Sequence, residues 1–188
     1  SGWKSVADHV WDTVDPDTYM ILEFFGDPSV ENELGGYRDE DGDTGSLMTW
    51  HNMNRPYSQA DMGFVSGEDF SSDLSDSYFG TRSGYDQASF IPYMESHDEQ
   101  WLMRRKKAFG NSAGAYSTQD FTTALNRQKL VGAFYFTLPG PRMMWQFGEL
   151  GYGWDEDECL KESDACTADD PGRTARKPVR WEYRDPEQ

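Results

Sequence analysis

The sequence predicts an α/β fold in which parallel strands alternate with helices. Segments with apolar residues at helical spacing alternate with short apolar runs that are bounded by Gly, Pro and Asp. The short runs lack the period-two alternation of a half-exposed strand, so we expect both of their faces to be buried, as in parallel sheets. Aromatic residues make up 15% of the 188 residues, which is enough to build the core of one domain.

The first half of the chain contains two predicted strands and three predicted helices. A helix is expected over 3–14, a strand over 19–25, a short helix over 28–34, a strand over 46–50 and a short helix near 58–62. The apolar face expected for the first helix consists of Trp3, Val6, Val10 and Val14. The strand over 19–25 is apolar throughout and is therefore expected to be buried.

The second half repeats the alternation and ends in an acidic tail. A third strand is expected over 89–96, a helix within 97–109, the longest helix over 118–137 and a fourth strand over 142–147. The remaining residues, 152–188, are expected to form long acidic loops.

The charge balance excludes several classes of function. The chain has 34 Asp and Glu against 17 Lys and Arg, for a net charge of −17, whereas nucleic acids and anionic membrane surfaces attract basic proteins. No apolar run is long enough to span a bilayer, and the first residues do not form a signal peptide. We therefore predict no nucleic-acid partner and no membrane partner. The acidic, Lys-poor composition fits either a saline habitat or ordinary solubility.

Carboxylates follow several of the predicted strands. Glu23 lies in the first, the sequence Glu95-Ser96-His97-Asp98 ends the third, and Glu149 follows the fourth. Ligands bind at the carboxyl ends of parallel strands, so these side chains could converge on one cleft. Convergent carboxylates suit glycoside hydrolysis, which needs a proton donor and an anion near the developing oxocarbenium ion. The alternative is that Glu23 or Asp98 is a helix cap or a salt-bridged strand-end residue.

Four segments resemble motifs of the alpha-amylase family, glycoside hydrolase family 13. ILEFFGD (21–27) resembles the strand-five motif, and YMESHDEQ (93–100) resembles the strand-seven motif. WHNMNRPYSQADMGF (50–64) resembles a segment between those strands in a bacterial branch of the family. GPRMMWQFGELGY (140–152), followed by GRTARKPVRWEY (172–183), resembles the strand-eight region and its loop.

The resemblance implies roles for individual residues. Glu23 matches the general acid/base, and Asp98 matches the carboxylate that stabilises the transition state and binds sugar hydroxyls. His97 matches the imidazole that binds the sugar beside the cleaved bond. Glu149 matches a supporting residue near the cleft, and Ser96 departs from the family's more common Asn.

The resemblance also implies a particular architecture for residues 1–188. The family's nucleophile is an Asp at the end of strand four, and no residue of this chain matches it. The expected fold is therefore a partial (β/α)8 TIM barrel with long acidic loops at its C-terminal end. Its expected domain is the C-terminal half of a catalytic barrel, strands five to eight, truncated at both ends. The expected partner is the missing N-terminal half of that barrel.

Two aromatic residues and a pair of cysteines are further candidates. Tyr152 and Trp154 could be sugar platforms, although packing in the core is an equal alternative. Cys159 and Cys166 are separated by six residues, which allows either a local disulfide or two thiols. A disulfide would indicate an oxidising compartment, so we expect an extracellular or periplasmic protein of bacterial type.

An acidic loop is a candidate calcium site. Asp39, Asp41 and Asp43 alternate as in a calcium loop but lack the distal Glu of an EF-hand, so a solvated loop is the alternative. The chemistry itself needs no cofactor.

The sequence thus predicts a retaining α-glucan hydrolase acting on starch or maltooligosaccharides, of which this chain is an inactive fragment. The alternatives are a transglycosylating or branching relative, and a non-catalytic sugar-binding relic.

Overall fold

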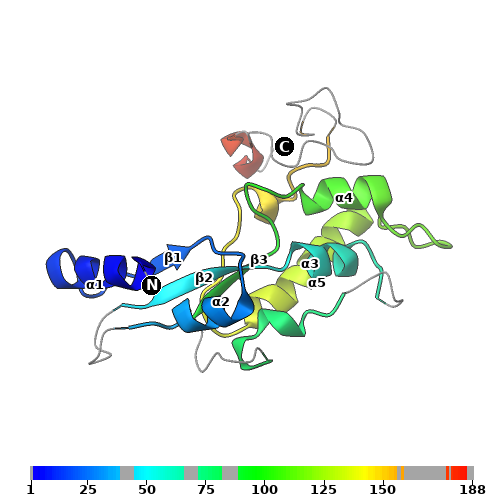
Figure 1. The fold of residues 1–188 in the computed structure, drawn as a ribbon. Helices are drawn as coiled ribbons and strands as arrows, with labels where there is room; N and C mark the ends of the chain where they lie inside the picture. Colours follow the sequence, from blue (N-terminus) through cyan, green and yellow to red (C-terminus); the bar gives the residue numbers. More distant parts are fainter. Residues whose placement is uncertain are drawn as a thin grey trace. The chain divides into compact units, whose positions relative to one another are not determined.

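The structure, a computed structural model, describes most of the chain, and Figure 1 shows its fold. The described residues are 2–38, 45–65, 72–81, 89–155, 158, 177 and 179–185. The chain divides into two compact units that are described separately. Unit 1 consists of Ser1–Asn52, Ser75–Pro92 and Leu138–Met143. Unit 2 consists of Met53–Leu74, Tyr93–Thr137 and Met144–Gln188.

A three-stranded parallel sheet forms the centre of unit 1. Its strands are β1 (Met20–Leu22), β2 (Leu47–Asn52) and β3 (Phe90–Tyr93), in the order β1-β2-β3. The register of β1 and β2 pairs Met20 with Leu47 and Leu22 with Thr49. Three of the predicted strands are therefore present. β1 is shorter than predicted and is not buried on both faces, because Ile21 is 50% exposed.

The predicted partial (β/α)8 barrel is wrong. The described residues form one three-stranded sheet with five α-helices, and no barrel. Residues 142–147 do not add a fourth strand, because among them only Met143 forms a bridge, where its amide donates to the Pro92 carbonyl at 3.1 Å. The chain then turns away through Phe147, whose φ is 69°, into the 3-10 helix η3 (Gly148–Leu150).

Two helices complete the core of unit 1. They are α1 (Gly2–Thr13) and α2 (Pro28–Leu34), and α2 lies beside β2 in Figure 1. Ala7 and Trp11 of α1 are buried in a cluster with Leu34 of α2. The helix was predicted, but its buried face is not the predicted one, because Val6 and Val14 are exposed. The Trp11 ring stacks on Tyr37 and its indole nitrogen donates to the Thr18 carbonyl, which fixes the orientation of α1.

The ends of α2 follow ordinary capping chemistry. Asp27 is the N-cap, and its carboxylate accepts a hydrogen bond from the Ser29 amide, 2.8 Å long. Pro28 stands in the first turn, where its missing N–H costs nothing. Hydrogen bonds from the Ser29 hydroxyl, the larger cause, and from the Ser29 amide lower the pKa of Asp27 from its ordinary value. The predicted helix over 28–34 is confirmed with these bounds.

Three helices pack against one another in unit 2. They are α3 (Asn54–Asp61), α4 (Leu102–Phe109) and α5 (Phe121–Thr137), and they lie close together in Figure 1. Their shared core consists of Met53, Tyr57, Ala60, Met94, Leu102, Val131 and Tyr135. The Tyr57 and Tyr135 rings meet edge to face at 5.6 Å, a geometry that adds to the energy of burial.

A second core in unit 2 is built mainly from aromatic residues. Trp101, Phe147 and Tyr152 are buried, and Tyr183 packs against them. The Tyr152 ring meets Trp101 at 4.9 Å and Tyr183 at 5.1 Å. This cluster joins the start of α4 to the segment after α5 and to the 3-10 helix η5 (Trp181–Arg184).

Gly153 closes the aromatic core, and replacing it with Ala should strongly destabilise unit 2. Its φ is 106°, and an added Cβ would lie 2.4 Å from Trp101 Cβ. We expect Gly153→Ala to lower the free energy of unfolding by about 3 kcal/mol, since it combines a positive φ with overpacking. Urea unfolding measures the effect. Gly114→Ala is the matched control, because Gly114 also has a positive φ, 68°, but open space around it. A loss no larger than that of Gly114→Ala would contradict the prediction.

Candidate functional site

The loop after β3 carries the strand-seven candidates. Ser96 donates from its hydroxyl to the Glu99 carboxylate, and the Asp98 amide donates to the Ser96 hydroxyl at 3.1 Å. Both Ser96 and Glu99 are buried. These bonds turn the backbone between them, so the loop is anchored on both sides of His97 and Asp98.

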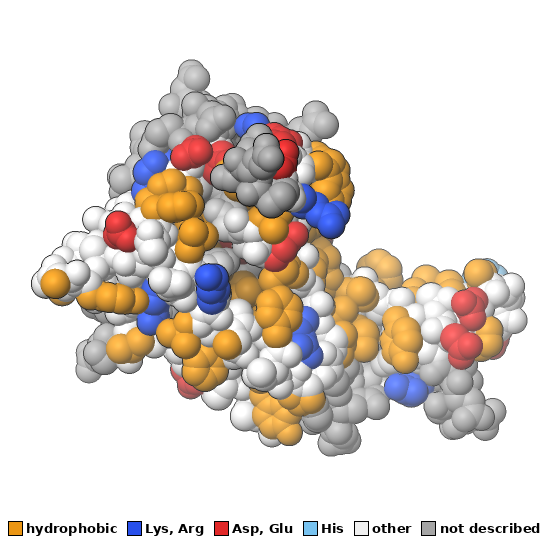
Figure 2. Space-filling view, turned by 180° about the vertical axis from the view of Figure 1, so that it is seen from behind, with side chains coloured by type: hydrophobic (Ala, Val, Ile, Leu, Met, Phe, Trp, Pro, Cys, Tyr) orange, Lys and Arg blue, Asp and Glu red, His pale blue; other side chains and the backbone are white. Residues whose placement is uncertain are grey.

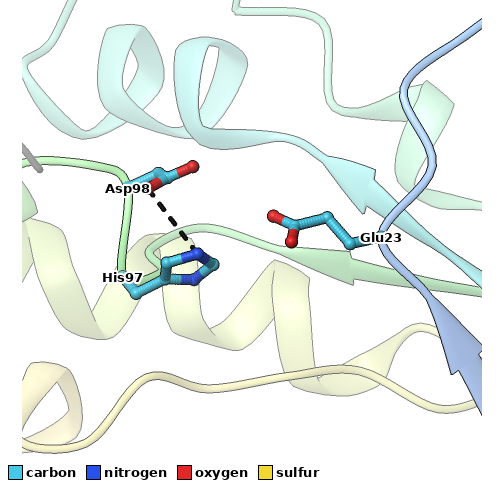
Figure 3. A group of neighbouring side chains, drawn as sticks. All are labelled: Glu23, His97 and Asp98. Carbon is cyan, nitrogen blue, oxygen red and sulfur yellow. Dashed lines mark ion pairs between the residues drawn. The ribbon is translucent and has the colours of Figure 1, made fainter.

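His97 and Asp98 form a partly exposed ion pair, which Figure 3 marks with a dashed line. His97 Nε2 lies 3.6 Å from Asp98 Oδ1, and the two side chains are 44% and 45% exposed. The His97 ring lies 6.0 Å from the Trp145 ring. Such a pair offers a carboxylate acceptor and an imidazole to a polar ligand, which is the chemistry of binding a sugar hydroxyl.

Lys177 secures the backbone of the same loop. Its ammonium donates to the His97 carbonyl at 2.6 Å and lies 5.8 Å from the centre of the Trp101 ring. Lys177 is only 9% exposed, so this contact is a partly desolvated one. This hydrogen bond joins Lys177 to the loop after β3, 80 positions earlier in the chain.

Glu95 stands at the base of the loop and is buried. Its Oε1 accepts a hydrogen bond from the Leu102 amide at the start of α4, 2.6 Å long. Its Oε2 occupies the space that a side chain at Gly148 would need, since a Cβ there would lie 2.1 Å away. Burial raises the pKa of Glu95 to about 7, against the smaller opposing effects of the Leu102 hydrogen bond and the Lys106 charge.

A buried ion pair lies next to this carboxyl. Lys106 Nζ is 2.5 Å from Asp61 Oδ2, and both side chains are fully buried. The ammonium also donates to Gln128 Oε1 of α5. Burial raises the pKa of Asp61 to about 6, with Lys106 opposing the shift. Sequence analysis missed this group, because Lys106 belongs to the run Arg104-Arg105-Lys106-Lys107, which is typical of a solvated helix surface.

The other predicted site residues are placed as follows. Glu23 follows β1 in unit 1 and is exposed. Glu149 lies in η3 of unit 2, exposed, beside a hollow of about 350 Å³. Tyr152 is fully buried, so its ring packs in the core and offers no face for stacking. Trp154 is partly exposed and lines a larger pocket of unit 2.

Two groups of candidates fall outside the described residues. The possible calcium ligands Asp39, Asp41 and Asp43 are one group, and Cys159 and Cys166 are the other.

Comparison with known proteins adds no family to this picture. No protein-family model matches the sequence, and no curated protein matches it significantly. Within the residues that the structure describes, no helix has the length and apolar character needed to cross a bilayer.

Proposed function

We propose that this chain belongs to a retaining α-glucan hydrolase in which Glu23 is the acid/base and Asp98 stabilises the transition state. His97 binds the sugar beside the cleaved bond. The proposal concerns the chemistry of these side chains and does not depend on a barrel.

The observation that carries the proposal is the His97–Asp98 pair in the loop that follows β3. Its side chains are about half exposed, its backbone is anchored by Ser96 and Lys177, and it follows a strand of a parallel sheet. Ligands of parallel sheets bind at that end of the strands. A carboxylate beside an imidazole can accept from one sugar hydroxyl while the ring contacts the next. The four motif-like segments add support, because they occur in the order expected of the family.

The proposed reaction proceeds in two steps. Glu23 donates a proton to the leaving glycosidic oxygen as the C–O bond breaks, and a carboxylate nucleophile bonds to the anomeric carbon. Glu23 then takes a proton from a water molecule, whose oxygen displaces the nucleophile and restores the α-configuration. Asp98 adds negative charge near the developing positive charge and also holds the sugar hydroxyls. No residue of this chain matches the nucleophile, so the natural protein that contains this sequence is the form to assay.

Substitution of the two carboxyls should abolish cleavage of maltoheptaose. In the natural protein, Asp98→Asn and Glu23→Gln should each reduce kcat at least about 100-fold, since each removes a charge or proton that the transition state needs. Reducing-sugar release gives the rate, and NMR of the first product gives the anomer. The controls are Asp12→Asn and Glu33→Gln, which change exposed carboxyls of α1 and α2.

Three results would overturn the proposal. One is activity of Asp98→Asn or Glu23→Gln above a hundredth of the parent's. Another is a first product of β-configuration. The third is binding of maltoheptaose without any turnover, which would favour a sugar-binding protein.

A further inference from the structure

Hydrophobic side chains reach the surface at several places, as the face in Figure 2 shows. Phe121, at the start of α5, is 47% exposed. It lines a pocket of about 920 Å³ that lies entirely within unit 2. That volume is within the range of about 300–1,000 Å³ that small-molecule sites have. The residues used below are Phe121, Trp154, Asp155, Glu158, Arg180 and Glu182.

Two aromatic rings form one wall of the pocket. The Phe121 and Trp154 rings have centroids 5.2 Å apart and planes tilted by 55°. Lys107 fixes Trp154 from outside the pocket lining, since its ammonium donates to the Trp154 carbonyl at 2.8 Å and lies 5.5 Å from the ring centre. The wall is therefore an aromatic surface whose position is set before any ligand arrives, which lowers the entropic cost of binding.

Glu158 shapes the backbone around Trp154. Its Oε2 accepts hydrogen bonds from the Gly153 amide at 2.9 Å and the Asp155 amide at 3.1 Å. Glu158 is only 4% exposed. Because this one buried carboxylate accepts from the amides on both sides of Trp154, it fixes the backbone turn at that residue. Glu158 therefore has a structural role and is not the group that a ligand would contact.

Another part of the pocket lining is a charge pair. Arg180 Nη1 lies 3.2 Å from Glu182 Oε1, and their side chains are 32% and 45% exposed. Hydrogen bonding to Glu182 is the main cause that raises the pKa of Arg180 above its ordinary value, so the guanidinium stays charged. The pair presents donors and acceptors side by side with no net charge. Asp155 adds one more acceptor at the rim.

This combination selects a ligand class. The carboxylates of Asp155, Glu158 and Glu182 disfavour an anion, and the charged and polar groups of the lining disfavour a purely apolar molecule. A pyranose ring has an apolar C–H face for the aromatic wall and hydroxyls that both donate and accept for the charge pair. We infer that the pocket lined by Trp154 and the Arg180–Glu182 pair is a second sugar-binding site, separate from His97 and Asp98. The choice of an α-glucan as the sugar rests on the proposed function.

Calorimetry with maltoheptaose on the full chain tests the inference. Trp154→Ala and Phe121→Ser should each weaken the Kd at least about tenfold, because each removes part of the aromatic wall. Trp154→Phe should restore much of the affinity. Trp3→Ala is the matched control, since Trp3 is an exposed Trp of α1 in unit 1. Thermal unfolding of each variant shows whether the fold is retained, and Phe121→Ser keeps the test valid if Trp154→Ala does not fold.

Asp98→Asn separates this inference from the proposed function. If the pocket binds sugar, Asp98→Asn retains the calorimetric affinity for maltoheptaose and Trp154→Ala loses it. This result is expected whether or not the natural protein cleaves glucans. If Asp98→Asn abolishes the affinity for maltoheptaose and Trp154→Ala leaves it unchanged, the inference about the pocket is overturned while the proposed function stays intact. Absence of any heat with maltoheptaose would also overturn it. Tighter binding of choline than of maltoheptaose would show that the aromatic wall selects a cation instead.

Discussion

Lys106→Met should lower the free energy of unfolding by about 3–5 kcal/mol at pH 8, the cost of breaking a buried ion pair on one side. Lys106 Nζ contacts Asp61 at 2.5 Å with both side chains fully buried, and its charge also acts on Glu95. Without the ammonium, the buried carboxyls of Asp61 and Glu95 lose the cation that acts on both of them. Urea unfolding, followed by circular dichroism, gives the loss directly.

The design of the control decides how that loss is interpreted. Lys129→Met makes the same chemical change on the exposed surface of α5 and should alter stability by less than about 0.5 kcal/mol. The double variant Asp61→Leu/Lys106→Met should be more stable than Lys106→Met alone, because replacing both partners leaves no unpaired charge of this ion pair in the core. A single variant within about 1 kcal/mol of the parent would contradict the prediction.

The loss in Lys106→Met should also depend on pH. Burial already raises the pKa of Asp61 to about 6 and that of Glu95 to about 7 with the ammonium present. Removing the cation favours the protonated carboxyls further, so the variant should recover part of its stability as the pH falls to 5. A loss of the same size at pH 5 and pH 8 would show that packing of the aliphatic stem, and not charge, dominates.

Much of the local structure could be predicted from the sequence. The helix over 28–34 has its predicted bounds because Asp27, Pro28 and Gly35 give unambiguous start and stop signals. The strands at 46–50 and 89–96 and the long helix of 118–137 were also found, with bounds shifted by a few residues. These segments are decided by neighbours in the sequence, which is the information that pattern analysis uses.

What failed depends on tertiary contacts. The first helix was predicted, but a short helix with several apolar positions allows more than one buried face. The face that carries Trp11 is the buried one, because Trp11 contacts Tyr37 and Thr18. The run 142–147 is apolar enough for a strand, yet only Met143 pairs with β3. The barrel was inferred from that fourth strand and from the resemblance, so the prediction of a barrel was wrong once the fourth strand proved absent from the described residues.

The candidate site divides in the same way. His97 and Asp98 were predicted at a strand end, where local sequence places them, and they lie in the loop after β3 as a partly exposed pair. The burial of Lys106 and the role of Gly148 in accommodating Glu95 had no local signal, because each depends on a residue more than 40 positions away. The convergence of Glu23 with Asp98 on one substrate stays a prediction.

The stability of the protein should fall as the pH rises from about 4.5 to about 7, and Glu95 should be a principal cause. Its folded pKa of about 7 exceeds the ordinary value of 4.5, so the folded state binds more protons in this interval. The unfolding free energy should decrease by up to about 3 kcal/mol across it, at about 1.4 kcal/mol for each pH unit. Below the interval both states are protonated, and above it neither is. Asp61, with its pKa raised to about 6, changes stability in the same direction.

Glu95→Gln should remove the Glu95 part of this slope. The amide oxygen can still accept from the Leu102 amide but cannot ionise, so the variant should exceed the parent in stability at pH 8 and differ little at pH 5. Urea unfolding at pH 5, 6, 7 and 8 measures both profiles. Glu149→Gln, an exposed carboxyl in the same unit, should keep the parent's profile. A parent whose stability is flat or rises over this range would contradict the assignment.

The position of Glu95 makes this titration relevant to the site. Glu95 holds the start of α4 through the Leu102 amide, and it lies two residues before His97. Ionisation of a buried carboxyl must be met by water, by Lys106 or by local opening, and local opening would release the turn that anchors the His97–Asp98 pair. Hydrogen exchange of the Leu102 amide should therefore accelerate between pH 6 and 8, beyond its intrinsic dependence on pH, in the parent but not in Glu95→Gln. Equal protection of the Leu102 amide from exchange in the two proteins would show that Lys106 compensates the charge of ionised Glu95 and that the loop stays closed.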